Sequence, residues 1–172
     1  PGSLVFPMFM ADGFFVSNLL PKRLGNADVR VLPPLGFDAH LPNLAAAYVK
    51  RVLAEKGWGE PQSRLFLAAH GSAKGPKAAE SAYAFQSAPS MRFGTLEISV
   101  GFVEEPPFIA DAARGLPAQS LCLPFFALEG DHCRHDIPEA LEDADFLGVL
   151  LPPLGTWAEI ATLVANTISQ SR

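Results

Sequence analysis

The chain has 172 residues, of which 49% are hydrophobic, and its mean hydropathy of +0.20 is that of a folded protein with a large core, which excludes a mainly disordered chain. The net charge of −5 and the pI near 5.3 lack the basic surplus of a nucleic-acid-binding protein. A small molecule or a protein is therefore the expected partner. The two cysteines, Cys122 and Cys133, form no disulfide framework and suit a reducing cytoplasm.

The first apolar run, "LVFPMFMADGFFVSNLL" at 4–20, is interrupted by Pro7, Asp12 and Asn18. It is shorter than the roughly 20 apolar residues that a membrane helix needs, and it lacks the basic start of a signal peptide. We therefore expect this run to form part of a core, and we expect a cytoplasmic protein without a membrane segment.

The same run begins an internal repeat. With an offset of 117 residues, "PMFMADGFFVSNLLPKRLGNAD" at 7–28 aligns with "PFFALEGDHCRHDIPEALEDAD" at 124–145, and after a two-residue gap "LPPLG" occurs at both 32–36 and 151–155. The shared positions are Pro7, Phe9, Gly13, Pro21, Leu24, Ala27 and Asp28. Ordered proline and glycine matches followed by an identical pentapeptide indicate a duplication.

Strands and helices are predicted to alternate along the rest of the chain. Short continuous apolar runs indicate strands that are covered on both faces. The predicted strands are 64–70, 95–103, 120–126 and 147–153, and the predicted helices are 43–57, 75–88, 107–115, 136–144 and 156–170. This order predicts an α/β fold with a parallel four-stranded sheet and helices on both faces.

The repeat divides the chain unequally. Residues 61–172 are predicted to form one complete unit, and residues 1–60 the second half of a degenerate copy, because 64–119 has no counterpart in the N-terminal copy. Either further strands precede Pro1 or the protein is built from one and a half units; the first is favoured.

The first candidate site residue lies in "AAHGSAKG" at 68–75, which puts His70 at the carboxyl end of a strand, where α/β folds display reactive groups. A turn histidine that only bonds the backbone is the alternative. A phosphate loop or a hydrolase built on Ser72 is weaker, because neither the nucleotide-binding patterns nor G-x-S-x-G is present.

The second candidate lies in "LEGDHCRHDIP" at 128–138. Asp136 and Glu139 have the D-x-x-E spacing of a helix start. His132 follows the strand 120–126 and is expected at the same sheet edge as His70, so the two can share a metal and leave positions open for a substrate. Cys133 and His135 could join them as further ligands.

The N-terminal copy serves as an internal control for these histidines. It has Phe15 at the place of His132 and Asn18 at the place of His135, although the surrounding prolines and glycine are kept. The fold therefore does not need the histidines, which favours a chemical role for them.

Together these stretches resemble a known family. "LFLAAHGS", "GFVEEPPFIADA", "LCLPFFALEGDHCRHDIPEAL" and "LPPLG", in this order, resemble the CbiX-type sirohydrochlorin chelatases, which are class II chelatases. The resemblance implies a cytoplasmic enzyme that inserts Co²⁺ or Fe²⁺ into sirohydrochlorin, a tetrapyrrole with many carboxylates, for cobalamin or sirohaem. The metal is then a substrate, and no organic cofactor is expected.

The resemblance also extends to the chain's organisation. Residues 1–58 resemble a degenerate partner from the two-unit form of the family, whereas two identical units pair in the short form. A pseudo-dimer within one chain, or a homodimer, is therefore expected.

The resemblance also implies the site residues. The two active-site histidines fall on His70 and His132, and both would be metal ligands. Alignment on an F-x-E pattern selects Glu104 as the site carboxylate, with Glu105 beside it, whereas alignment on the distance to Pro106 selects Phe102.

Basic and polar residues near the two histidines complete the expected site. Ser72, Lys74 and Arg134, together with Lys77, are candidates to bind the substrate's carboxylates. The alternatives are a non-catalytic protein that binds a tetrapyrrole or delivers a metal, and an α/β scaffold in which the histidines are incidental.

Overall fold

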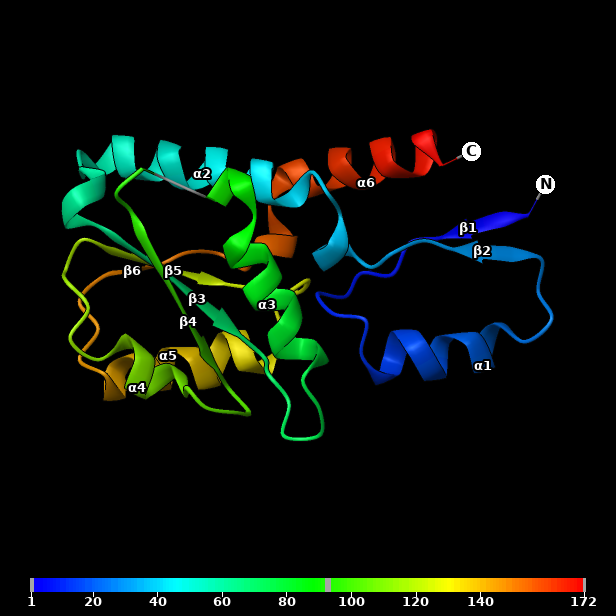
Figure 1. The fold of residues 1–172 in the computed structure, drawn as a ribbon, viewed down its shortest axis with the longest axis horizontal. Coiled ribbons are helices and arrows are strands. Elements are labelled where there is room, and N and C mark those ends of the chain that lie inside the picture. Colours follow the sequence, from blue (N-terminus) through cyan, green and yellow to red (C-terminus); the bar gives the residue numbers. More distant parts are fainter. Residues whose placement is uncertain (1, 92–93, 172) are drawn as a thin grey trace.

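The computed structural model describes residues 2–91 and 94–171, and its largest element is a parallel four-stranded sheet in the order β4-β3-β5-β6 (Figure 1). The strands are β3 (Arg64–Ala69), β4 (Glu97–Phe102), β5 (Ser120–Pro124) and β6 (Val149–Leu150). Each is followed by a helix, which confirms the predicted α/β architecture of the complete unit.

Helices cover both faces of this sheet, and the buried side chains of β3 alternate between the two. Leu65, Leu67 and Ala69 pack with α2 (Leu41–Lys56), α3 (Lys77–Ser87) and the start of α6 (Ala158–Gln170). Phe66 and Ala68 pack with α4 (Ile109–Ala113) and α5 (Ile137–Asp143). This two-residue period is that of a strand buried on both sides, and it explains the continuous apolar run in the sequence.

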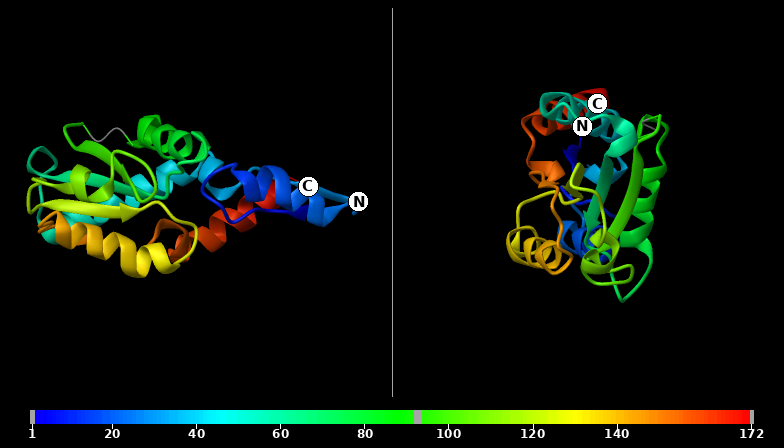
Figure 2. Two further views of the ribbon diagram at one scale, coloured as in Figure 1. Left: turned by 90° about the horizontal axis from the view of Figure 1, so that it is seen from below. Right: turned by 90° about the vertical axis from the view of Figure 1, so that its left-hand side faces the viewer.

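A second, smaller sheet lies at the other end of the molecule. It pairs β1 (Ser3–Val5) with β2 (Val29–Val31) in parallel, and the short helix α1 (Leu20–Leu24) lies between them in the chain. The strands of both sheets run toward the middle of the molecule (Figure 1). The carboxyl edges of the two sheets therefore face each other, and both termini lie at the end of the smaller sheet (Figure 2).

The two halves exchange their long helices. α2 follows β2 in the chain, yet Ala45, Val49 and Leu53 lie in the core of the four-stranded sheet. In return, α6 extends back toward the small sheet, where Thr167 Oγ1 donates a hydrogen bond to Asp38 Oδ2 at 2.5 Å. Ile168 also lines a cavity of about 900 Å³ together with residues of β1 and β2. A division of the chain at residue 60 is thus not a boundary in the packing.

The repeat is present in the backbone as well as in the sequence. A π-helical turn at Phe15–Leu19 (η1) has its counterpart at His132–Asp136 (η5), at the same offset as the sequence repeat, and each turn leads directly into a helix. The strand registers agree too, because Leu4 pairs with Arg30 as Leu121 pairs with Val149. The structure thus contains one complete unit and a partial copy.

The two "LPPLG" segments make the same close contact. Gly36 N donates to Phe9 O at 3.1 Å, and Gly155 N donates to Phe126 O at 2.9 Å. A Cβ added to Gly36 would lie 1.9 Å from Met10 O, and one added to Gly155 would lie 2.1 Å from Ala127 O. Only glycine permits this approach of two backbones, which explains its presence in both copies.

Within the part of the chain that the structure describes, no helix is long and apolar enough to cross a membrane.

Candidate functional site

The candidate site lies at the carboxyl edge of the four-stranded sheet, where three strands end side by side. His70 follows β3 directly, and the backbone ladder to β4 continues past it, because Glu104 N donates to His70 O at 2.9 Å. This bond holds Glu104 beside His70. His132 begins the π-helical turn η5 after β5, the strand that pairs with β3 on its other side.

These three residues form one cluster of possible metal ligands. One ligand atom each from His70, Glu104 and His132 lies within 4.8 Å of the other two, and no other group of this kind occurs in residues 2–91 and 94–171. The two imidazole rings are nearly perpendicular, at 86°, with centroids 4.6 Å apart. Two nitrogens and one carboxylate oxygen can hold a divalent metal while other coordination positions stay open.

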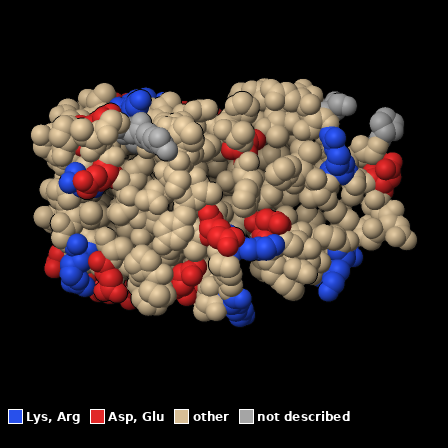
Figure 3. Space-filling model, viewed as in Figure 1, with Lys and Arg blue, Asp and Glu red and all other residues tan. Residues whose placement is uncertain are grey.

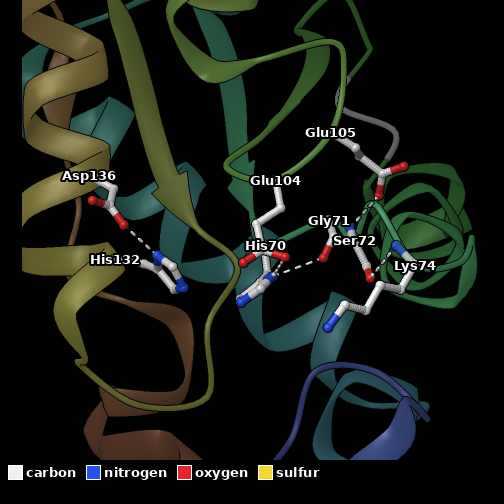
Figure 4. A network of polar contacts seen from close by, with 8 residues as sticks. All are labelled: His70, Gly71, Ser72, Lys74, Glu104, Glu105, His132 and Asp136. Carbon is white, nitrogen blue, oxygen red and sulfur yellow. Dashed lines mark hydrogen bonds and ion pairs between the residues drawn. The ribbon is translucent and has the colours of Figure 1, made fainter.

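The hydrogen bonds of the histidines determine which ring nitrogens are available. His70 Nδ1 lies 2.8 Å from Gly71 O, and His132 Nδ1 contacts Asp136 Oδ2 (Figure 4). Because a carbonyl or carboxylate oxygen only accepts, Nδ1 carries the proton in both rings, and both Nε2 lone pairs are free. The acceptor is a neutral carbonyl for His70 and a carboxylate for His132, and in both cases this contact fixes the orientation of the ring.

The contact of Asp136 corrects one prediction from the sequence. Asp136 and Glu139 were expected to start a helix. The backbone is already helical over His132–Asp136, before α5 begins at Ile137, and the Asp136 side chain makes no capping hydrogen bond. Its carboxylate instead reaches one helical turn back to His132. Residues four apart lie on the same helix face, so this geometry follows from the wound backbone.

Glu105, the second carboxylate after β4, is not part of the cluster and bonds a neighbouring loop. Glu105 Oε1 accepts a hydrogen bond from Ser72 N at 2.7 Å and so ties the loop after β3 to the loop after β4. Gly71 permits this because its φ is +71° and a Cβ there would lie 2.8 Å from Glu105 Cγ. Phe102, which the alternative alignment selects, is 1% exposed and belongs to the core.

The candidate substrate-binding residues have different partners. Ser72 Oγ accepts from Lys74 N at 3.2 Å, and Lys74 is exposed on the same loop (Figure 4). Arg134 Nε lies 3.8 Å from Glu129 Oε1, and Lys77 Nζ lies 3.6 Å from Asp12 Oδ2. On the face shown in Figure 3, acidic and basic side chains meet where the two halves join.

The structure does not bring Cys133 or His135, the possible further ligands, into the cluster. Cys133 is 8% exposed, and its thiol donates to Leu128 O at 3.8 Å. Burial raises the pKa of the Cys133 thiol, although a hydrogen bond with the Gly130 backbone acts in the opposite direction. A metal binds the thiolate, so this thiol is a poor ligand. His135 is exposed and lies outside the group of converging atoms.

A comparison with known protein families covers this part of the chain. The CbiX family profile matches residues 64–171, which include the whole four-stranded sheet and all three residues of the cluster. The chain belongs to the CbiX family of chelatases. No curated protein sequence matches the chain.

Solved structures extend this family match over the whole chain. CbiX, the terminal enzyme for biosynthesis of siroheme in denitrifying bacteria, is 38% identical over 99% of this chain and 76% of its own, with a TM-score of 0.90. SirB from Bacillus subtilis with Fe³⁺ is 13% identical over 98% of this chain and 70% of its own, with a TM-score of 0.74. DR2241 from Deinococcus radiodurans, a multi-domain protein with structural similarity to chelatases, is 20% identical over 98% of this chain and 41% of its own, with a TM-score of 0.76. The last two share the fold with this CbiX-family chain.

Two neighbours of the cluster were not identified from the sequence. Asp136 was interpreted as a helix start, although its position four residues after His132 was a usable signal. Phe126 was placed only in a strand, yet its ring centroid lies 6.2 Å from that of His70 and 6.1 Å from that of His132. It therefore lies beside both imidazoles, which no spacing pattern indicated.

Proposed function

We propose that this CbiX-family protein inserts a divalent metal, Co²⁺ or Fe²⁺, into sirohydrochlorin for cobalamin or sirohaem biosynthesis. The convergence of His70, Glu104 and His132 at the sheet edge is the observation that supports the proposal. All three are partly exposed, with 45%, 48% and 34% of their side chains accessible, so an ion and a large ligand can both reach them. In this proposal the metal is a substrate, and no organic cofactor takes part.

The ligand set suits an ion that must be released. Two imidazole nitrogens and one carboxylate bind a divalent ion without enclosing it, so the pyrrole nitrogens of the macrocycle can enter the open positions. Imidazole and carboxylate ligands accept both Co²⁺ and Fe²⁺, and availability in the cell then decides between them.

The same groups can accept the protons that leave the macrocycle. Insertion breaks two pyrrole N–H bonds and forms metal–nitrogen bonds, so two protons depart for each metal ion bound. As the ion moves to the pyrrole nitrogens, the Nε2 lone pairs of His70 and His132 become free to accept protons. The Asp136 carboxylate stabilises the positive charge on His132 when it does so.

The remaining parts of the proposal concern the chain's organisation. Residues 1–60 would be the second half of a degenerate chelatase repeat, and residues 61–172 the unit that carries the chemistry. The two would form a pseudo-dimer whose facing carboxyl edges receive the substrate, or the chain would pair with a second copy. We further propose that the protein works in the cytoplasm.

An anaerobic absorbance assay with sirohydrochlorin and Co²⁺, and separately Fe²⁺, tests this function. Wild-type protein should accelerate insertion above the spontaneous rate, and the double variant His70→Ala/His132→Ala should not. Glu104→Gln should also lose activity, whereas Glu105→Gln keeps an oxygen that can accept from Ser72 and should retain most of it. A wild-type protein that binds sirohydrochlorin without accelerating insertion would support a non-catalytic binding protein instead.

A further inference from the structure

The N-terminal half carries a patch of exposed aromatic side chains that the chemistry of the cluster does not use. Phe9, Phe14 and Phe15 are 43%, 65% and 59% exposed. The rings of Phe9 and Phe15 are stacked with centroids 6.1 Å apart, and Phe14 meets Phe15 edge to face at 6.0 Å. We call these three residues the aromatic patch. Large phenyl groups that are held together yet left open to solvent indicate a binding surface.

The repeat shows where this patch lies relative to the metal cluster. Phe15 begins η1 as His132 begins η5, and Phe9 takes the place of Phe126. The Phe9–Phe15 centroid distance of 6.1 Å equals that between Phe126 and His132. The degenerate copy therefore presents a phenyl ring at the place where the complete unit presents its metal-binding imidazole.

A direct contact joins the segment that carries the patch to α3, the helix that follows the His70 loop. Lys77 Nζ, at the start of α3, donates to Ser17 Oγ at 3.2 Å within η1 and pairs with Asp12 Oδ2 at 3.6 Å. α3 follows the loop that carries His70, Ser72 and Lys74. The N-terminal segment, in blue, passes below Lys74 in the view of the site (Figure 4).

The exposure of Phe15 has a parallel in the complete unit. In the complete unit, where all four strands are present, the repeat-equivalent residue His132 still has 34% of its side chain exposed. A residue at this position thus faces the space beyond the sheet edge even in a whole unit. The Phe15 side chain would therefore stay exposed even with further strands beside β1.

We infer that the aromatic patch binds one face of the tetrapyrrole macrocycle, opposite the face that meets His70 and His132. This inference rests on the proposed function. Phenyl rings offer a flat apolar ring system a stacking surface that the charged cluster does not provide. The two carboxyl edges would then have separate roles. The complete unit supplies the metal and accepts protons, and the degenerate copy binds the macrocycle.

The test measures binding of metal-free sirohydrochlorin to the whole chain by titrating the ligand's absorbance. Phe15→Ala should raise its Kd about tenfold, and Phe15→Leu, which keeps an apolar side chain but loses the ring, should raise it nearly as much. Binding of Co²⁺ alone should not change in either variant, since Phe15 is not a ligand. Phe37→Ala removes another half-exposed phenyl ring, 48% accessible and outside the patch, and should leave both affinities unchanged.

The outcomes separate this inference from the proposed function. Unchanged sirohydrochlorin affinity in Phe15→Ala would overturn the stacking role even if metal insertion proceeds normally. Full affinity in Phe15→Leu with a loss only in Phe15→Ala would overturn it too, because a general apolar contact would then suffice. Conversely, wild-type protein that binds the macrocycle through the patch but never accelerates insertion would contradict the chelatase activity and leave the stacking role supported.

Discussion

The π-helical turns η1 and η5 have the same backbone and opposite chemistry. Each starts after a parallel strand, leads into a helix that carries proline in its first turn, and presents its first side chain beyond the sheet edge. In η5 that side chain is His132, supported by Asp136, whereas in η1 it is Phe15, with Leu19 at the place of Asp136. The architecture therefore requires neither histidine nor aspartate, which supports the chemical role proposed for them in the complete unit.

This comparison suggests experiments that convert a residue of the complete unit into its counterpart in the degenerate copy. Such a substitution is already accommodated by an equivalent backbone in the same molecule. Loss of activity can then be assigned to chemistry with less concern about folding.

The largest effect is expected for His132→Phe, which gives the complete unit the residue found at position 15. The cluster loses one of its two nitrogens and a proton acceptor, so the insertion rate should fall by about 10²- to 10⁴-fold. The measurement is the anaerobic absorbance assay with sirohydrochlorin and Co²⁺. His135→Asn, which introduces the residue found at Asn18, is the matched control and should keep its activity; an equal loss there would contradict the assignment of His132.

A smaller effect is expected for Asp136→Leu, which introduces the residue found at position 19. Without the carboxylate, His132 is no longer held with its Nε2 lone pair toward His70, and Co²⁺ affinity should fall by about 10- to 100-fold. Titration with Co²⁺ followed by its visible absorbance measures this.

Asp136→Asn separates orientation from charge. The amide oxygen still accepts a hydrogen bond from His132 Nδ1, so this variant should recover part of the affinity. Identical losses in the leucine and asparagine variants would show that the carboxylate's charge matters more than its hydrogen bond.

Alanine substitution at Gly36 and at Gly155, the two glycines of the repeated backbone contact, should lower the free energy of unfolding by similar amounts. A Cβ at Gly36 or Gly155 collides with a carbonyl oxygen in the opposite segment, so each alanine variant should lose about 1–3 kcal/mol of unfolding free energy. Urea denaturation provides the measurement. A loss in only one of the two variants would show that the two copies do not share this contact in solution.

The smallest effect is expected for Cys133→Val, which introduces the residue found at position 16. Both side chains are buried, at 8% and 7% exposure. Because burial raises the pKa of the Cys133 thiol, the thiolate that a metal would need is scarce at neutral pH and becomes more abundant only as the pH rises toward the raised value. Cobalt affinity at pH 7 should therefore be unchanged; a clear loss would restore Cys133 as a ligand.

The sequence was sufficient to predict the parallel sheet, its helices and the repeat, because buried strands leave continuous apolar runs and duplicated turns keep their prolines and glycines. It also placed His70 and His132 at one edge, since parallel strands end together. The exchange of α2 and α6 between the halves could not be predicted, because both helices are apolar on the packed face whichever sheet they cover.

The role of Asp136 was missed for a related reason. Its spacing to Glu139 is that of a helix start. The helical backbone of η5, which begins four residues earlier, directs the Asp136 carboxylate toward His132. The F-x-E pattern selected Glu104 in the sequence but left Glu105 beside it as a second candidate. The ladder between β3 and β4 distinguishes them, because it brings Glu104 to His70 and leaves Glu105 to the loop.

The most direct test of the account is a crystal of the protein soaked with Co²⁺ and measured at the cobalt absorption edge. We expect one anomalous peak per chain within bonding distance of His70 Nε2, His132 Nε2 and a Glu104 oxygen, and no peak beside Phe15. A peak at Cys133 or His135, or an empty cluster at saturating cobalt, would contradict the claim that the complete unit carries the metal chemistry.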